Sequence, residues 1–138
     1  MSDLNAILKK HGLKVTESRK AILKVFRNIT YALSYSELDK ELKGCLDKVT
    51  VYRTLKSFEE SGIIHEVMDG SSKTKYALCH DGMCSENIHF DSHVHFKCNS
   101  CEKTFCLEST QIPTIKLPDG YITNKQFVSF HGQCRECA

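Results

Sequence analysis

Several features that would indicate a membrane protein, a secreted protein or an enzyme are missing from this sequence of 138 residues. No apolar run approaches the roughly 20 residues needed to span a bilayer. The first residues, Met1–Asn5, lack the basic start and apolar stretch of a secretory signal. No HExxH helix, nucleotide-binding loop or nucleophile–base pattern is visible. We therefore expect a cytoplasmic protein with no membrane partner, no small-molecule substrate and no enzymatic activity.

Cysteine and histidine are plentiful but unevenly distributed. Residues 1–78 contain one cysteine and two histidines, whereas residues 79–138 contain seven and five. Eight cysteines in a reducing cytoplasm indicate metal binding or redox chemistry rather than disulfides. The first part has 14 Lys/Arg against 10 Asp/Glu, a net charge of +4, and the second has 5 against 7, a net charge of −2. This division suggests two functions, although a surplus of +4 is equally typical of an ordinary solvated surface.

Four helices are predicted in the first part from the spacing of apolar residues and from the polar residues that precede them. Thr16 is a cap for the second helix, and the sequence Ser34–Glu37 fits a capping box for the third. The fourth helix runs from Asp47 or Lys48 to Ser61. The apolar positions of the four helices are Leu4, Ile7 and Leu8; Ile22, Val25, Phe26 and Ile29; Leu38 and Leu42; and Val51, Leu55 and Phe58.

A hairpin is predicted after the fourth helix, where the apolar period becomes that of a strand. The segments Ile63–Val67 and Lys73–Leu78 are predicted to be strands, and the turn-forming cluster Asp69–Ser72 joins them. Helices followed by a short hairpin predict a winged helix-turn-helix. The fourth helix would then be the recognition helix that enters the major groove of DNA.

The exposed face of this fourth helix carries side chains that suit DNA. With its apolar positions turned inward, the residues left on the outside are Thr50, Tyr52, Arg53 and Lys56. Arginine hydrogen-bonds guanine edges or phosphates, and the hydroxyls of tyrosine and threonine suit phosphate oxygens or thymine contacts. The alternative is a solvated surface helix, but the neighbouring wing favours DNA contact.

Two motifs resemble those of the ferric uptake regulator family. Thr50–Leu55 reads TVYRTL, like the recognition helix of the family, and Thr16–Arg19 with Ala21–Leu23 resembles its earlier T-x-x-R and IL motif. The resemblance extends over nearly the whole chain. It implies a homodimeric, metal-responsive repressor that binds palindromic operators. Carried over by position, it makes Arg19, Tyr52 and Arg53 the DNA-contacting residues.

Two CxxC pairs predict a structural zinc site. Cys98 and Cys101 form the first pair, Cys134 and Cys137 form the second, and 32 residues separate the two pairs. Four thiolates complete a tetrahedral, closed zinc site that stabilises a fold and leaves no position for substrate. The alternatives are a thioredoxin-like redox pair, two unrelated thiol pairs, or a zinc-ribbon module that binds another protein. The ferric uptake regulator family has the same pairs in the same places, which favours structural zinc.

A second, regulatory metal is predicted from the alternating segment His93–Phe96. On a strand, Val94 and Phe96 face the core, while His93 and His95 share the other face and can bind one ion. By position these two match histidines of the regulatory site of the family. The further candidate ligands are His89, Cys84, Cys79, Cys106 and, with less support, His80. Cys45 lies among the predicted helices and is expected to be a small buried side chain.

The sensed metal is predicted from the departures from the family pattern. Iron- and peroxide-responsive members usually have a carboxylate at the position of Cys106. The aspartate that the family commonly has between the two histidines is Val94 here. Sulfur in place of oxygen moves a site toward zinc and away from Fe(II) or Mn(II). The zinc-uptake branch also uses a cysteine from the linker before the histidine pair. We therefore expect Zn²⁺ as the regulatory metal, with Fe²⁺ or Mn²⁺ as the alternatives.

The predicted fold class is α+β. A winged-helix DNA-binding domain would span residues 1–78, a hinge with candidate ligands residues 79–92, and a zinc-stapled dimerisation domain residues 93–138. In the last of these, residues 93–97, 103–107, 121–123 and 127–130 are expected to form a small sheet that pairs two subunits. A homodimer would match the two half-sites of a palindromic operator.

Overall fold

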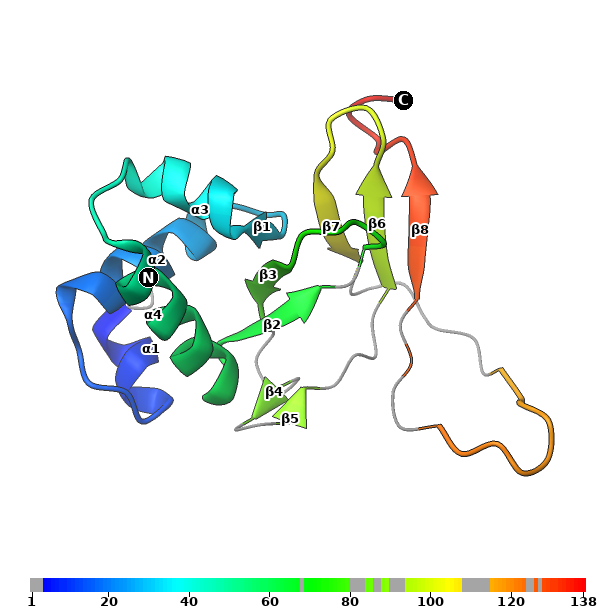
Figure 1. Cartoon of the computed structure of the whole chain (residues 1–138), viewed down its shortest axis with the longest axis horizontal. Coiled ribbons are helices and arrows are strands. Elements are labelled where there is room, and N and C mark those ends of the chain that lie inside the picture. Colours follow the sequence, from blue (N-terminus) through cyan, green and yellow to red (C-terminus); the bar gives the residue numbers. More distant parts are fainter. Residues whose placement is uncertain are drawn as a thin grey trace.

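The computed structural model places a helical part beside a second, mainly β part, and confirms the predicted α+β fold (Figure 1). Four helices and a three-stranded sheet form the first part, and another three-stranded sheet forms the second. The residues that the structure describes are 4–67, 69–79, 84–85, 88–89, 94–107, 115–123, 126 and 128–138.

The helices begin where their capping residues predict. They are α1 Leu4–Lys10, α2 Glu17–Asn28, α3 Tyr35–Leu42 and α4 Lys48–Glu60. The side chains of Thr16, Ser34 and Asp47 each accept a backbone N–H of the first turn, and Ser34 forms the complete capping box with Glu37. Within the described part of the chain, no helix has the length and apolar character that crossing a bilayer requires.

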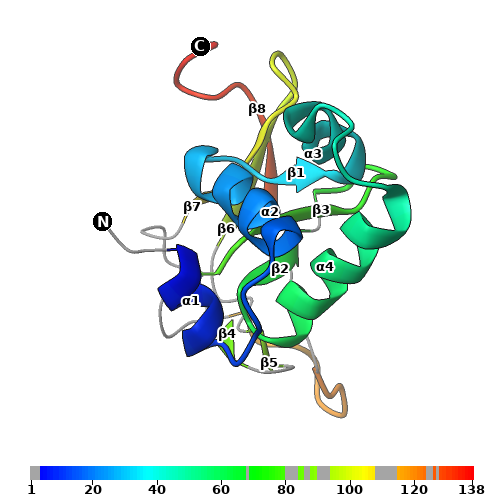
Figure 2. The ribbon, with the colours of Figure 1, turned by 90° about the vertical axis from the view of Figure 1, so that its left-hand side faces the viewer.

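The core of the helical part joins all four helices to the strand that follows them. From the helical side, α2 and α4 lie in front of the strands (Figure 2). The predicted inward residues of α4, Val51, Leu55 and Phe58, are all buried. Burying an apolar side chain of this size stabilises a fold by roughly 1.5–3 kcal/mol. The remaining buried members of this core are Leu8, Ile22, Leu23, Phe26, Leu33, Leu38, Leu42, Ile63 and Ile64.

The predicted wing is the antiparallel pair of β2, Ile64–Val67, and β3, Lys75–Leu78. A third strand, β1 at Leu33–Ser34, joins the far side of β3. The hairpin has two distinct faces. Ile64 packs into the helical core, whereas Val67 lies in a second apolar cluster with Ala77, and Cys106 of the other sheet packs against that cluster. The hairpin therefore connects the two parts of the molecule.

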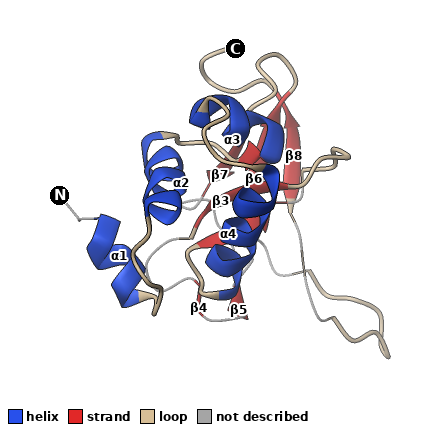
Figure 3. Cartoon of the chain, turned by 60° about the vertical axis from the view of Figure 1, so that its left-hand side comes forward, coloured by secondary structure: helices blue, strands red, loops and turns tan. Residues whose placement is uncertain are grey.

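The second sheet has the order β7-β6-β8, with β6 at its centre (Figure 3). Its strands are β6 Val94–Cys98, β7 Thr104–Leu107 and β8 Ser129–Gly132. β7 is antiparallel to β6 and β8 is parallel to it. Between the two larger sheets in sequence, β4 Cys84–Ser85 and β5 Ile88–His89 form a short antiparallel pair.

The sequence prediction of a strand at Tyr121–Thr123 is wrong. These residues follow a turn at Pro118–Gly120 and have no strand partner among the described residues. Tyr121 is 70% exposed and Ile122 is 90% exposed. The surrounding segment extends away from both larger sheets (Figures 1 and 3). The β-branched and aromatic side chains of Tyr121–Thr123 are not sufficient to form a strand, because β propensity depends on neighbouring residues that pack against these side chains.

The expectation that Cys45 is buried is also wrong. The α3 helix ends at Leu42 and is followed by Lys43 and Gly44, which both have left-handed backbone conformations. Cys45 follows them in the loop that leads to α4, and its side chain is exposed. Its position between helices in the sequence therefore does not place it in the core.

Candidate metal centres and nucleic-acid interface

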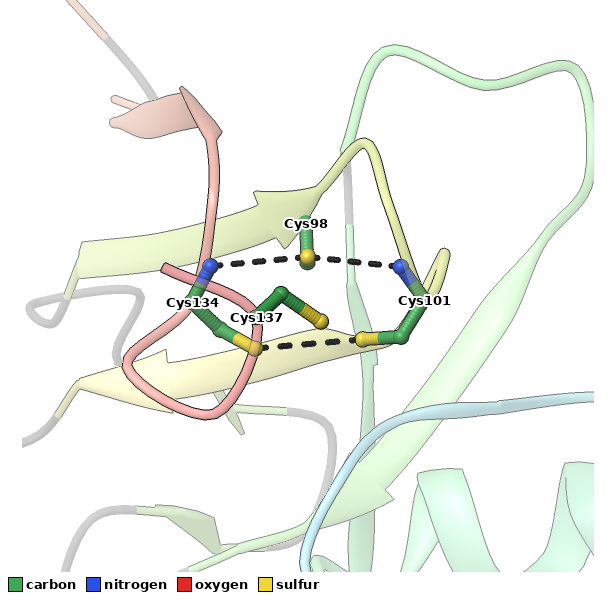
Figure 4. Close-up of side chains that lie close together, drawn as sticks. All are labelled: Cys98, Cys101, Cys134 and Cys137. Carbon is green, nitrogen blue, oxygen red and sulfur yellow. Dashed lines mark hydrogen bonds between the residues drawn. The ribbon is translucent and has the colours of Figure 1, made fainter.

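The four cysteines of the two CxxC pairs converge at one end of the second sheet (Figure 4). Cys98 ends β6, Cys101 lies in the turn that follows it, and Cys134 and Cys137 come after β8. Their sulfur atoms all lie within 4.8 Å of one another, and those of Cys101 and Cys134 are 3.9 Å apart. Because β8 runs parallel to β6, the last residues of the chain reach the turn at the end of β6.

Backbone donors prepare one of these sulfurs to carry a negative charge. The N–H groups of Cys101 and Cys134 each donate to the Cys98 sulfur at 3.4 Å and lower the pKa of its thiol to about 6. Hydrogen bonds to the other sulfurs, that of Cys134 first, raise the pKa of Cys137 to about 12. Four convergent sulfurs with one ready thiolate match the donor set of a closed, tetrahedral zinc site.

A second group of potential ligands joins the two parts of the molecule. His65 comes from β2, His95 from β6 and Cys106 from β7, and their ligand atoms lie within 4.8 Å of one another. His95 and Cys106 are cross-strand partners, and Cys106 Sγ lies 3.8 Å from His65 Nε2. Both histidines are buried. One imidazole of the wing hairpin thus meets an imidazole and a thiol of the second sheet.

His65 was not among the ligands predicted from the sequence. It lies on β2, on the same face as the buried Val67 and opposite to Ile64 and Glu66. A histidine on the apolar face of a strand is the only local signal for this residue. The second sheet, which supplies its neighbours, lies about 30 to 40 residues away in sequence.

Cys79, a predicted ligand, lies on the other side of the His65 ring. Its sulfur is 3.5 Å from His65 Nδ1, whereas the sulfur of Cys106 faces Nε2. An imidazole that binds a metal through one nitrogen commonly has its other nitrogen held by a neighbouring group. Cys79 therefore contacts the His65 ring but lies outside the group formed by His65, His95 and Cys106.

The other predicted ligands are only partly covered by the described structure. His93 and His80 lie outside the described residues. Cys84 and His89 are directly opposite each other in the β4–β5 ladder, where only the backbone is described. Of the predicted pair His93 and His95, the structure therefore brings His95 to the cluster with Cys106.

A polar contact next to this cluster ties the tip of the wing to the second sheet. Asp69 and Lys75 form an ion pair with an Oδ2–Nζ distance of 2.9 Å, and both side chains are buried. The Thr104 hydroxyl on β7 donates to Asp69 at 2.7 Å, and Lys75 donates to Thr104 and to the backbone oxygen of Glu102. The two buried charges thus form an ion pair within the wing hairpin, and both are hydrogen-bonded to Thr104 of the second sheet.

The side chains predicted to contact DNA lie along α4, with one on α2. Tyr52, Arg53 and Lys56 are exposed on α4, as predicted. Thr50 is half-buried, and its hydroxyl donates to Asp47 as part of the helix cap. Arg19 is half-buried on α2 and donates to the backbone oxygen of Lys14 at 2.8 Å.

Comparison with known proteins gives one consistent result. The model of the "Ferric uptake regulator family" matches residues 10–129. The ferric uptake regulation protein of Staphylococcus epidermidis is 32% identical over an alignment 143 positions long, which covers 99% of this chain and 94% of that protein. The solved ferric uptake regulator of Vibrio cholerae has a TM-score of 0.64 at 23% identity, covering 96% of this chain and 100% of its own. A zinc uptake regulator solved with zinc and DNA has a TM-score of 0.62 at 20% identity, covering 96% and 88%.

Proposed function

Because this chain belongs to the ferric uptake regulator family, we propose that it is a zinc-sensing repressor of metal homeostasis genes that binds palindromic operators as a homodimer. Members of this family are metal-responsive, DNA-binding transcription regulators rather than enzymes. The observation that carries the finer proposal is the cluster of His65, His95 and Cys106, in which both parts of the molecule supply ligands. Such a regulator works in the cytoplasm, where its operator is.

The chemistry of the cluster supports zinc as the sensed metal. Its donors are two imidazoles and one thiol, and no carboxylate joins them among the residues that the structure describes. Zn²⁺ binds well to imidazole and thiolate ligands, whereas Fe²⁺ and Mn²⁺ prefer sites that include carboxylate oxygens. His93, His89 and Cys84 remain our proposed additional ligands, and Cys79 is proposed to hold the far nitrogen of His65.

The four cysteines are proposed to bind a separate, structural zinc ion. A bound Zn²⁺ would hold all four sulfurs as thiolates and so stabilise the fold around them. Cys98 and Cys101 anchor this site to β6, and Cys134 and Cys137 bring the end of the chain to it. Its ligand positions are all filled by protein sulfurs, which suits a permanent site rather than a sensor.

The regulatory ligands can couple metal concentration to the orientation of the recognition helix. His65 lies on the strand that directly follows α4, and His95 and Cys106 lie on the second sheet. When all three bind one ion, the wing and α4 are held in one orientation relative to that sheet. Without this link the two parts can change their relative orientation, and DNA affinity falls by a coupling free energy of about 1–3 kcal/mol.

Exposed apolar residues between β7 and β8, and on β8 itself, support the homodimer. Ile115, Leu117, Tyr121, Ile122 and Phe130 are large, apolar and exposed within one chain. Large apolar side chains that are exposed in one chain are typical of protein–protein contacts where they form a contiguous patch. Two copies joined through them would place two α4 helices, with Tyr52, Arg53 and Lys56, on the two half-sites of an operator.

Metal-dependent DNA binding tests this proposal. Protein stripped of exchangeable metal is titrated with Zn(II), Fe(II) or Mn(II) against a duplex selected from a random-sequence pool. We expect Zn(II) to restore binding in the wild type and in the control His131→Ala, whose side chain is exposed. His65→Ala is expected to lose the response to Zn(II). A full zinc response in His65→Ala contradicts the proposed site, and restoration by Fe(II) or Mn(II) alone contradicts zinc as the sensed metal.

A further inference from the structure

A stacked pair of tyrosines links the recognition helix to the helix before it. The rings of Tyr35, the first residue of α3, and Tyr52, on α4, have centroids 4.7 Å apart and planes that differ by 6°. Tyr35 is half-buried and packs against the helical core, whereas Tyr52 is 44% exposed. One ring is therefore held by the fold, and the other lies on it at the surface.

A lysine completes this arrangement. Lys48, the first residue of α4, has its ammonium nitrogen 6.0 Å from the centroid of Tyr35 and 5.8 Å from that of Tyr52. Nearly equal distances to two parallel rings place the ammonium group beside the stack rather than above its outer face. This position leaves the cation exposed at the N-terminal end of α4, next in sequence to Asp47, whose carboxylate caps the helix.

We propose that Tyr35 is a positioning residue for DNA recognition, which holds the ring of Tyr52 in the orientation that contacts the operator. The proposal rests on the proposed function, because it assumes that Tyr52 contacts DNA. Tyr35 itself does not need to contact the duplex. Lys48 beside the stack supplies a charge for the neighbouring phosphate.

The physical reason is the conformational freedom of an exposed tyrosine. A surface side chain normally populates several rotamers, and immobilising it on binding costs free energy. Contact with the face of Tyr35 restricts the Tyr52 ring before DNA arrives. Part of the conformational entropy of the Tyr52 side chain is therefore already lost during folding. The free energy of forming the sequence-specific complex is more favourable by that amount. Binding that depends only on phosphate charge gains nothing from this restriction.

Two substitutions separate stacking from simple packing. Tyr35→Phe keeps the ring, and Tyr35→Leu keeps an apolar side chain without a ring. With zinc-loaded full chain, we expect Tyr35→Leu to weaken binding to the selected duplex by about three- to tenfold, and Tyr35→Phe by less than about twofold. Both variants are expected to bind a scrambled duplex of equal length with the same affinity as the wild-type protein.

Further measurements decide between the outcomes. In a Tyr52→Ala background, Tyr35→Leu is expected to cause no additional loss, because the residue through which it acts is gone. If Tyr35→Leu does not fold by circular dichroism, Tyr35→Met provides a second ring-free variant. Unchanged affinity of a folded ring-free variant, or equal losses on selected and scrambled duplexes, overturns the role of Tyr35. If Tyr52→Ala alone leaves binding unchanged, the proposed DNA contact itself is wrong.

Discussion

The Thr104 hydroxyl on β7 donates a hydrogen bond of 2.7 Å to the Asp69 carboxylate at the tip of the wing. Asp69 lies in the turn between β2 and β3, Thr104 belongs to the second sheet, and both residues are buried. Lys75 neutralises the carboxylate and also contacts Thr104, so that a charge, its counter-charge and a hydroxyl form one contact between the two parts of the molecule. Thr104 lies on β7, the strand that also holds Cys106, one of the proposed regulatory ligands.

Removing the positive charge of this contact is expected to destabilise the fold. Lys75→Met leaves the Asp69 carboxylate buried without its counter-ion, which typically costs about 3–5 kcal/mol. Urea unfolding followed by circular dichroism measures the loss. The matched control is Lys56→Met, because Lys56 is exposed and lies 4.0 Å from Glu60, and such surface pairs contribute little. Equal stabilities of the two variants contradict the importance of the buried pair.

The stability of the wild type relative to Asp69→Asn is expected to depend on pH. Burial raises the pKa of Asp69, but hydrogen bonds from Ser71, Thr104 and Lys75 outweigh it and lower the pKa well below its usual 3.8. The Asp69 carboxylate therefore contributes its full stabilisation of the folded state above a pH of about 4. This stabilisation is lost below that pH, because the unfolded state takes up the proton first. Unfolding of both proteins between pH 7 and pH 3 tests this. A difference that stays constant over this range contradicts it.

Loss of one CxxC sulfur is expected to remove the structural zinc. Cys98→Ser should lower the zinc content by about one ion per subunit and lower the thermal midpoint, since four thiolates complete the site. Elemental analysis and thermal denaturation measure the two effects. Cys45→Ser is the control, because Cys45 is exposed and lies outside both ligand groups. Full zinc content in Cys98→Ser would show that this site does not hold the ion.

Exchange of sulfur for oxygen in the second cluster is expected to change its metal preference. In Cys106→Asp a carboxylate replaces the thiol that lies beside His65 and His95. Zinc affinity at this site should fall at least about tenfold, because even the loss of a group that only hydrogen-bonds a metal ligand commonly lowers metal affinity that much. The response to Mn(II) should increase, because Mn(II) prefers oxygen ligands. Competition with a chromophoric chelator measures both. An unchanged order of metals argues against Cys106 as a ligand.

A charge in the exposed segment that follows the turn at Pro118–Gly120 is expected to separate the subunits. Ile122 is 90% exposed in the single chain, and Ile122→Glu should weaken the dimer at least about tenfold if this side chain is buried between two copies. Sedimentation velocity over a concentration series measures the dissociation constant. Val49→Glu is the control, since Val49 is also exposed but lies on α4. A dimer equally strong in both variants places the interface elsewhere.

Local features of the sequence determine much of this protein. Capping at Thr16 and Ser34 and the helical spacing of Val51, Leu55 and Phe58 predict the helices correctly, because these interactions join residues a few positions apart. Two CxxC pairs predict four convergent sulfurs for a related reason. Each tight turn presents two sulfurs together, and only one long-range contact is then needed to form the group.

Tertiary structure alone decides what the two sheets bring together. His65 reaches Cys106 across 41 positions, and Asp69 reaches Thr104 across 35, because one face of the wing hairpin packs on the second sheet. The stack of Tyr35 on Tyr52 likewise depends on how α3 lies against α4. Periodicity tells which face of a strand or helix is apolar, but not which distant element covers it. That choice is made by the packing of the whole chain.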